Sequence, residues 1–190
     1  MKYLLATNNK NKLREIKTIL GEENVLSLSD CNIDVDIEET GTTFEENSKI
    51  KARAICKLSG LPTIADDSGL EVDFLNGAPG VYSARFAGEE HDDEANRQKL
   101  LRLMADVPDE KRTAHFTTVI SVVYPDGKEY AFEGKAYGKI TREYIGSGGF
   151  GNDCLFMSDD LGKTFAEATP EEKNAVSHRG RALRKLAEIL

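Results

Sequence analysis

Asp66 and Asp67 are adjacent carboxylates, followed directly by Ser68 and Gly69, in the middle of an otherwise apolar stretch. Successive side chains of an extended chain point to opposite sides, so one carboxylate can face a ligand while the other braces the chain. Carboxylates beside a buried strand suit a hard cation such as Mg²⁺, which takes oxygen ligands from protein and from substrate phosphates. Asp, Ser and Gly are also ordinary turn residues, so an acidic turn explains this stretch equally well.

The residues on either side of this acidic stretch predict two short strands joined by a turn. Residues 61–65 (LPTIA) read as a buried strand entered through a proline, and residues 70–73 (LEVD) alternate like a second strand. Gly69 permits either a bend of the backbone or the close approach of another group.

A second candidate site lies near the start of the chain. Residues 2–6 predict a strand, and a helix with Leu13 and Ile16 on its apolar face is expected to end at Gly21. The polar loop between them ends at a helix N-terminus, where free backbone N–H groups and the helix dipole attract anions. Its residues are Thr7, Asn8, Asn9, Lys10, Asn11 and Lys12. The P-loop pattern is absent, and a solvated Asn-rich turn is the alternative.

A second acidic turn, residues 38–43 (EETGTT), follows predicted strands over residues 25–28 and 33–37. Thr43 and Glu46 have the spacing of a capping box, so a helix is expected to begin there and to end at Gly60. Among the basic residues of that helix, Lys51 is the candidate for a functional role; most such charges are simply solvated.

The last third of the chain has a glycine-rich loop and two helix starts. Residues 146–151 (GSGGFG) match the dinucleotide-binding pattern, but a strand is expected after them rather than a helix, so we reject that interpretation. The loop instead suits the approach of backbone and Phe150 to a flat ligand. Lys173 lies in the first turn of a helix that begins at Thr169. His178 and Arg179 begin the last helix, where cations oppose the dipole, so either a ligand acceptor or chance surface placement is expected.

Composition narrows the class of protein. The chain has 190 residues, of which 39% are hydrophobic, and a formal net charge of −8 with a pI of about 5.0. A protein that coats nucleic acid needs a basic face, which this charge disfavours. The three cysteines form no CxxC pair, so we expect a reducing, cytoplasmic location. No apolar run has the length of a membrane span, and the first residues turn polar too early for a signal peptide.

Several of these motifs together resemble one known family, the inosine triphosphate pyrophosphatases, also called XTP/dITP diphosphatases. The similarity covers nearly the whole chain, and motifs in a fixed order are far more specific than any one alone. The motifs, in order, are residues 7–12 (TNNKNK), 38–47 (EETGTTFEEN), 65–70 (ADDSGL), 77–85 (GAPGVYSAR), 148–151 (GGFG) and 177–179 (SHR).

The resemblance implies a single domain over residues 1–190, with an α/β fold: a long mixed central sheet flanked by helices, and two lobes around a substrate cleft. It implies a homodimer and Mg²⁺-dependent hydrolysis of deaminated purine nucleoside triphosphates to the monophosphate and pyrophosphate. By resemblance Asp67 is the general base and a metal ligand, and Glu38 is a second ligand, although Glu39 is adjacent. The implied substrate-binding residues are Thr7 to Lys12, Lys51, Ser68, Phe150, Gly151, Asn152, Asp153, Lys173, His178 and Arg179.

One segment departs from the family pattern. An aromatic residue and a proline usually stand where this chain has Asn152 and Cys154. We hypothesise that the loss of one stacking wall weakens base binding or shifts specificity. A cysteine nucleophile at position 154 has little support, because Cys is commonly a small buried apolar residue. Two alternatives to the pyrophosphatase remain: a phosphatase that acts on another phosphorylated metabolite, and a nucleotide-binding regulator without catalysis.

Overall fold

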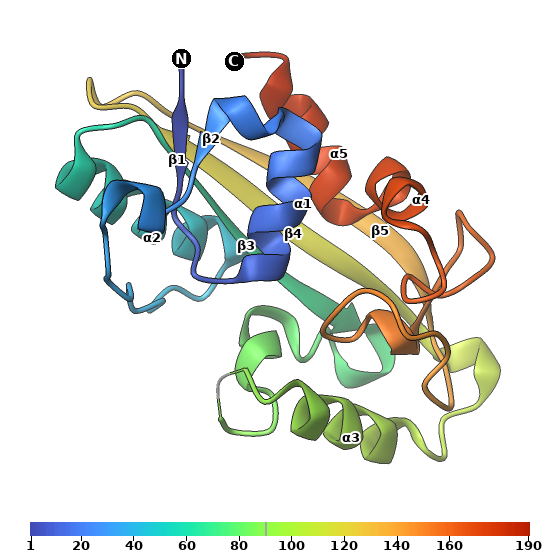
Figure 1. The fold of residues 1–190 in the computed structure, drawn as a ribbon. Helices are drawn as coiled ribbons and strands as arrows, with labels where there is room; N and C mark the ends of the chain where they lie inside the picture. Colours follow the sequence, from blue (N-terminus) through green and yellow to red (C-terminus); the bar gives the residue numbers. More distant parts are fainter. Residues whose placement is uncertain (90) are drawn as a thin grey trace. The chain divides into compact units, whose positions relative to one another are not determined.

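The computed structural model describes residues 1–89 and 91–190 and contains one mixed six-stranded sheet in the order β2-β1-β3-β4-β5-β6 (Figure 1). β1 pairs in parallel with both β2 and β3, whereas β5 and β6 are antiparallel. The strands are β1 (Tyr3–Leu5), β2 (Val25–Leu26), β3 (Thr63–Val72), β4 (Thr113–Val123), β5 (Glu129–Ile140) and β6 (Phe156–Ser158). The predicted α/β class with a mixed sheet and flanking helices is confirmed.

The chain divides into two compact units. Unit 1 comprises residues 1–67, 118–134 and 179–190, and unit 2 comprises residues 68–117 and 135–178. Three strands, β3, β4 and β5, contribute residues to both units.

Unit 1 packs three helices on the two faces of its part of the sheet. α1 (Lys10–Leu20) and α5 (His178–Ala187) share a core with Ile120 and Val122, and they lie side by side in Figure 1. α2 (Phe44–Ser59) packs in a separate core with Val123. Because alternate residues of a strand point to opposite faces, this division places α2 on the face of β4 opposite to α1 and α5.

The helices of unit 1 begin and end where the sequence predicts. Thr43 Oγ1 accepts a hydrogen bond from Glu46 N at the start of α2, and Gly60 ends that helix in the left-handed region, with φ of 71°. α1 ends at Gly21, as predicted. A side chain at a left-handed position is strained, so glycine suits both ends.

Unit 2 is built around an aromatic core. Phe116 of β4 packs against Phe156 and Phe165, with ring centroids 4.6 and 5.8 Å away. α3 (Asp93–Met104) contributes Leu100 and Met104 to this core, and α4 (Pro170–Val176) begins at the predicted position, where Thr169 and Glu172 form a capping box. A Cβ at position 69 would lie 2.2 Å from Gly80 O, so close approach of the backbone explains the glycine there.

Two predictions about strands are wrong. One continuous strand, Thr63–Val72, takes the place of the two predicted strands and the turn between them. An extended chain is possible at Asp66 and Asp67 because their carboxylates find partners on opposite sides of it. Residues 33–37 alternate between half-buried and exposed, yet they are not a strand of the sheet. Alternating burial follows from packing one side of an extended segment, and it does not require a neighbouring strand.

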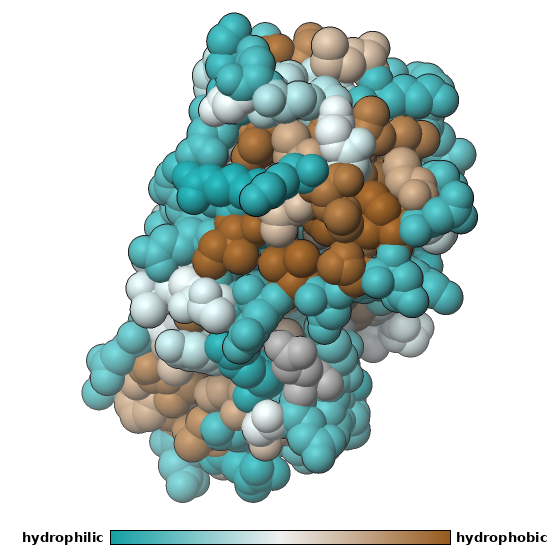
Figure 2. Space-filling model, turned by 90° about the vertical axis from the view of Figure 1, so that its left-hand side faces the viewer, coloured by the Kyte–Doolittle hydropathy of each residue, from teal (hydrophilic) through white to brown (hydrophobic). Residues whose placement is uncertain are grey.

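The face of the molecule drawn in Figure 2 has an apolar area in its upper part. In unit 1, Leu58 of α2 is 61% exposed. Half-buried apolar side chains around the α2 core are Leu26, Cys31, Ile33, Val35, Ile37 and Leu61. Within the described part of the chain, the helices are all too short or too polar to cross a membrane.

Candidate functional site

The first candidate cluster surrounds the two carboxylates of β3 in unit 1. Asp66 is fully buried, with Lys12 Nζ 3.2 Å from its Oδ2. Arg179 donates to the same oxygen from Nη2 at 3.3 Å and from Nε at 3.4 Å. Burial alone would raise the pKa of Asp66, but the charges of Lys12, Arg179 and Lys51 outweigh it and hold this pKa well below its usual value. Asp66 is therefore an ionised anchor for buried cations.

Asp67 lies in the opposite situation on the other face of the strand. Its Oδ2 accepts a hydrogen bond from Asn47 Nδ2 at 3.1 Å, and the residue is 5% exposed. Burial raises the pKa of Asp67 to about 6, and the negative charge of Glu39 adds to the effect, against the positive charge of Lys51. A carboxylate with a pKa near neutral is suited to accept a proton from water and to release it again.

The acidic turn of residues 38–43 reaches Asp67 through Glu39 and Asn47. Glu39 Oε1 pairs with Lys51 Nζ at 2.9 Å, whereas the neighbouring Glu38 is exposed. Gly41 N donates to Asn47 Oδ1 at 2.8 Å. Asn47 thus joins the backbone of the acidic turn to the Asp67 carboxylate with one buried amide.

The loop of residues 7–12 is folded around its own side chains. Asn9 caps α1, because its Oδ1 accepts from Asn11 N at 3.0 Å and from Lys12 N at 3.1 Å. Thr7 Oγ1 accepts from Asn9 N, and Asn8 donates to Val35 O. The Asn9 side chain therefore already engages two of the N–H groups that the sequence offers to an anion. The Lys10 residue is exposed, in contrast to the inward-facing Lys12.

The residues beside Asp67 fit a divalent cation. Mg²⁺ is usually held by one or two carboxylates together with waters and substrate phosphates, rather than by an all-protein cage. Asp67 and Glu39 are two electrostatically coupled carboxylates, which matches that requirement. Residues 1–89 and 91–190 contain no group of three or more His, Cys, Asp or Glu side chains that could hold a metal ion.

The second candidate cluster lies in unit 2 around Lys173 and Asp153. Their side chains are each 6% exposed, and Lys173 Nζ is 2.7 Å from Asp153 Oδ2. The same ammonium lies 4.5 Å from the centroid of the Phe150 ring, and Phe150 N donates to Asp153 Oδ2 at 3.0 Å. The glycine-rich loop and α4 therefore meet in one buried ion pair beside an aromatic ring.

His178 and Arg179 are adjacent in sequence but belong to different units. The His178 ring stacks on Phe116 in unit 2, with centroids 4.8 Å apart and planes at 14°. The Arg179 guanidinium is in unit 1, where it pairs with Glu15 as well as Asp66. The position of this cation at a helix start is thus explained by two carboxylate partners that lie far away along the chain.

Comparison with known proteins identifies the family. The Ham1 family model matches residues 3–189. The dITP/XTP pyrophosphatase of Clostridium perfringens is 51% identical, over all of this chain and 97% of the relative, and that of Escherichia coli O157:H7 is 48% identical, over all of this chain and 98% of the relative.

This chain belongs to the Ham1 family. Solved structures of Ham1 proteins agree. The Staphylococcus aureus protein gives a TM-score of 0.87 at 42% identity, over 99% of this chain and 97% of that one. The Coxiella burnetii protein gives 0.88 at 40% identity, over all of this chain and 98% of that one. The resemblance read from the sequence motifs is confirmed.

One residue of this Ham1 chain, Asn47, was not predicted from the sequence as a site residue. It belongs to the motif of residues 38–47, and the feature that could have identified it is a polar residue on the buried side of α2. Asn152 is half-buried, and among the described residues its Oδ1 has no hydrogen-bond partner. Ser68 is half-buried in β3. Burial raises the pKa of the Cys154 thiol, which disfavours the thiolate that a nucleophile needs.

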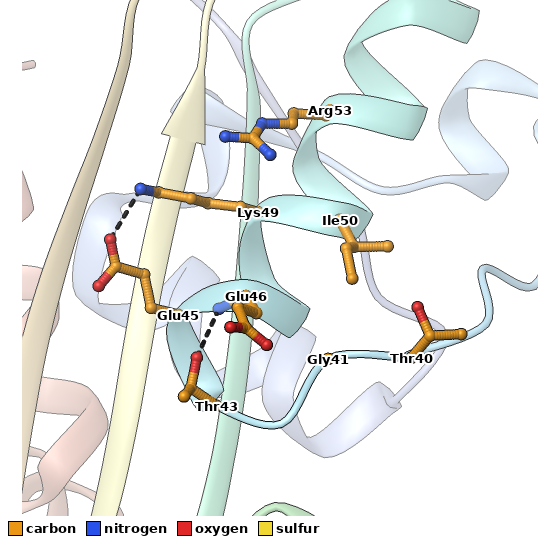
Figure 3. A pocket seen from close by; sticks show the side chains of 8 residues that line it. All are labelled: Thr40, Gly41, Thr43, Glu45, Glu46, Lys49, Ile50 and Arg53. Atoms are coloured by element: carbon orange, nitrogen blue, oxygen red, sulfur yellow. Dashed lines mark hydrogen bonds and ion pairs between the residues drawn. The ribbon is translucent and has the colours of Figure 1, made fainter.

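A pocket of about 620 Å³ lies beside the first turns of α2 of the Ham1 chain (Figure 3). Its lining residues are Thr40, Gly41, Thr43, Glu45, Glu46, Lys49, Ile50 and Arg53. At 100° per residue, the lining positions of α2 lie on the side of the helix opposite to Asn47 and Lys51. Lys49 bonds Glu45, and Arg53 bonds Glu129, so these charges are already paired. We assign no chemistry to this pocket.

Proposed function

We propose that this chain hydrolyses deaminated purine nucleoside triphosphates, namely ITP, dITP and XTP, to the monophosphate and pyrophosphate. Its Ham1 relatives from C. perfringens and E. coli carry the name dITP/XTP pyrophosphatase. The observation that carries the proposal is Asp67, a buried carboxylate with a pKa of about 6 beside Glu39 and close to the basic side chains of Lys12 and Lys51. That combination supports hydrolysis of a polyanion by an activated water.

Asp67 is the proposed general base. Its carboxylate takes a proton from water, whose oxygen then bonds the α-phosphorus while the bond from that phosphorus to the bridging oxygen breaks. Pyrophosphate leaves with the electron pair of that bond. The hydrogen bond from Asn47 to Asp67 Oδ2 fixes the orientation of the carboxylate, so that the base is already positioned before the reaction.

We propose Mg²⁺ as the cofactor, held by Asp67 and by Glu39 or Glu38. When bound, the ion would neutralise phosphate charge and stabilise the leaving pyrophosphate. Glu39 is favoured over Glu38 because it influences the Asp67 pKa and pairs with Lys51, whereas Glu38 is exposed.

Cationic and polar groups of unit 1 are proposed to bind the phosphates. Lys12 and Lys51 are nearly enclosed by protein, and burial lowers the pKa of Lys12 although Asp66 opposes the effect. A bound polyphosphate would return this pKa toward its usual value, because nearby negative charge favours the ammonium. Lys10, Thr7 with the asparagines 8, 9 and 11, and Ser68 complete the proposed phosphate and sugar contacts.

Base recognition is assigned to Phe150, Gly151, Asn152, Asp153, Lys173 and His178. The Phe150 ring offers an aromatic face, and the buried Lys173 and His178 offer donors of the kind that the 6-keto oxygen of hypoxanthine or xanthine accepts. Adenine carries an amino group at that position and would leave a buried donor unpaired, which penalises the wrong base strongly. Arg179 was predicted as a further base contact, and its carboxylate partners favour a structural role through Asp66 instead.

The remaining assignments rest on the resemblance. We propose one ITPase-like domain over residues 1–190, a cytoplasmic location and a homodimer without nucleic-acid partners. The exposed Leu58 and the half-buried apolar side chains around the α2 core offer surface of the type that stable interfaces bury. Light scattering of the purified chain and of a Leu58→Asp variant would test the homodimer.

Product analysis tests the function. ITP, XTP, dITP, GTP and ATP are incubated with Mg²⁺ or with EDTA, beside an Asp67→Asn variant. Pyrophosphate and monophosphate from the deaminated nucleotides, lost in EDTA and in the variant, would support the proposal. Orthophosphate would indicate the phosphatase, and binding without turnover would indicate the regulator.

A further inference from the structure

The loop that precedes β6 is rich in glycine and needs anchors to hold one shape. Gly149 and Gly151 both have positive φ, of 66° and 57°, in a region that glycine enters freely. A Cβ at position 149 would lie 2.3 Å from Asp153 Oδ2, so this glycine lets the Asp153 carboxylate fold back onto the loop. Gly148 N donates to Ala166 O at 3.0 Å, which fixes the beginning of the loop.

The middle of the loop is fixed from α3. Arg97 Nη1 donates to Gly151 O at 2.8 Å, and Arg97 Nη2 donates to Glu94 Oε2 at 3.0 Å. The guanidinium carbon lies 5.5 Å from the centroid of the Tyr144 ring. Because the guanidinium is a rigid planar fork, holding one Nη atom on Glu94 and the plane over Tyr144 orients the other toward Gly151.

The partners of Arg97 are themselves held in a network. Glu94 Oε1 accepts from Gln98 Nε2 at 3.0 Å and from Tyr144 OH at 3.1 Å. Gln98 Nε2 also donates to Tyr144 OH at 3.0 Å. Glu94 and Gln98 of α3, together with Tyr144 before the glycine-rich loop, thus hold the Arg97 guanidinium in the orientation in which it bonds Gly151.

We infer that Arg97 is a positioning residue for base recognition, acting through the Gly151 carbonyl on the segment of residues 150–153. This inference rests on the proposed function, which assigns that segment to the base. Arg97 Nε is buried and has no hydrogen-bond partner among the described residues, so the hydrogen bonds that hold the guanidinium in place come from its two Nη atoms. Lysine at this position has one nitrogen and cannot bond Gly151 and Glu94 with the same fixed geometry.

The experiment compares Arg97→Gln and Arg97→Lys with Arg102→Gln, an exposed arginine of the same helix. Isothermal titration measures binding of inosine monophosphate and, separately, of inorganic tripolyphosphate, and kinetics give kcat and KM for ITP. We expect Arg97→Gln to weaken inosine monophosphate binding and to raise the KM for ITP by about 10-fold or more, the range for a lost hydrogen bond from a charged donor. Tripolyphosphate binding, kcat and all Arg102→Gln values should stay within about two-fold of wild type, and Arg97→Lys should resemble Arg97→Gln.

The results separate this inference from the proposed function. Absence of ITP turnover by the wild-type chain would count against the function alone, because inosine monophosphate binding still reports on Arg97. Unchanged inosine monophosphate binding in Arg97→Gln would overturn the inference, and so would an equal loss of tripolyphosphate binding. If Arg97→Gln does not fold, Glu94→Gln replaces it, because a substitution of the exposed Glu94 disturbs folding less. The Glu94→Gln variant should weaken inosine monophosphate binding by about three-fold.

Discussion

Asp66 and Asp67 are consecutive residues of β3, yet their carboxylates lie in opposite electrostatic environments. Asp66 Oδ2 is 3.2 Å from Lys12 Nζ and is surrounded by cations, whereas Asp67 Oδ2 accepts from the neutral Asn47 amide at 3.1 Å. The pKa of Asp66 is held well below its usual value, and that of Asp67 is raised to about 6. Strand alternation places two identical side chains on different faces, and their different neighbours there make one an anchor and the other a candidate base.

The raised pKa of Asp67 predicts a pH-dependent gain in stability for Asp67→Asn. Between the unfolded value of 3.8 and about 6, the folded chain binds more protons than the unfolded chain, so the Asp67 contribution to the free energy of unfolding falls as pH rises. In EDTA at pH 7.5 the variant should exceed wild type by up to about 3 kcal/mol. Thermal or urea unfolding at pH 4 and at pH 7.5 measures the difference, which should nearly vanish at pH 4.

The same variant should lose at least about 100-fold in turnover, because an amide cannot accept the proton from water. A variant both stable and inactive would show that stability and the chemistry conflict at this position. Equal stability of variant and wild type at pH 7.5 would contradict the raised pKa.

Replacing Asp66 should have the opposite effect on stability. Asp66→Asn leaves the half-buried Lys12 and the buried Arg179 without their shared counter-charge, and breaking a buried ion pair such as that between Asp66 and Arg179 costs about 3–5 kcal/mol. The contribution of Asp66 is fully present above the unfolded pKa of 3.8, so the loss should shrink as pH falls below that value. Urea unfolding at pH 7 with an exposed control, Asp34→Asn, measures it. A loss no larger than that of the control would contradict this account.

Asn47 is expected to matter more for turnover than for substrate affinity. Asn47→Ala removes both the donor to Asp67 and the acceptor from Gly41 N, so it frees the carboxylate and the acidic turn together. We expect the kcat for ITP to fall by about 10-fold or more, with a smaller change in KM, since misplacing a reacting group slows the chemical step. Lys57→Ala, exposed on the same helix, is the control, and a rise in KM at unchanged kcat would count against a positioning role.

Asn152 provides a test of base stacking. If position 152 lines the base, Asn152→Tyr adds an aromatic face worth about 1–3 kcal/mol and should lower the KM for ITP by about 5- to 150-fold. Ser147→Tyr, exposed in the same loop, controls for a general effect of tyrosine. An unchanged KM would show that residue 152 does not stack on the base.

Helix boundaries were predictable because their causes are local. Each helix boundary depends on a hydrogen bond to a residue within four positions, and the structure contains these bonds at Thr43, Gly60 and Thr169. The continuous β3 was not predictable in the same way. A strand through Asp66 is stable because Arg179, 113 positions away, donates to it, and that partner has no signature near Asp66 in the sequence.

The segment of residues 33–37 shows a different limit. Ile33, Val35 and Ile37 are half-buried and the residues between them are exposed, so the alternation correctly predicted which side chains face the core. Membership of a sheet additionally needs a neighbouring backbone, which hydrophobic pattern does not encode. Arg97 and Asn47 were not predictable for a similar reason, because the carbonyl of Gly151 and the carboxylate of Asp67 are brought close to them only by the fold.

The partition of the chain has a consequence for how the protein can be divided. The polypeptide passes between unit 1 and unit 2 after residues 67, 117, 134 and 178, so neither unit is encoded by one uninterrupted segment. A stop codon or a proteolytic cut in the middle of the chain would therefore remove pieces of both units at once. We expect fragment expression to yield no autonomously folding half, and the gene to tolerate domain shuffling only as a whole.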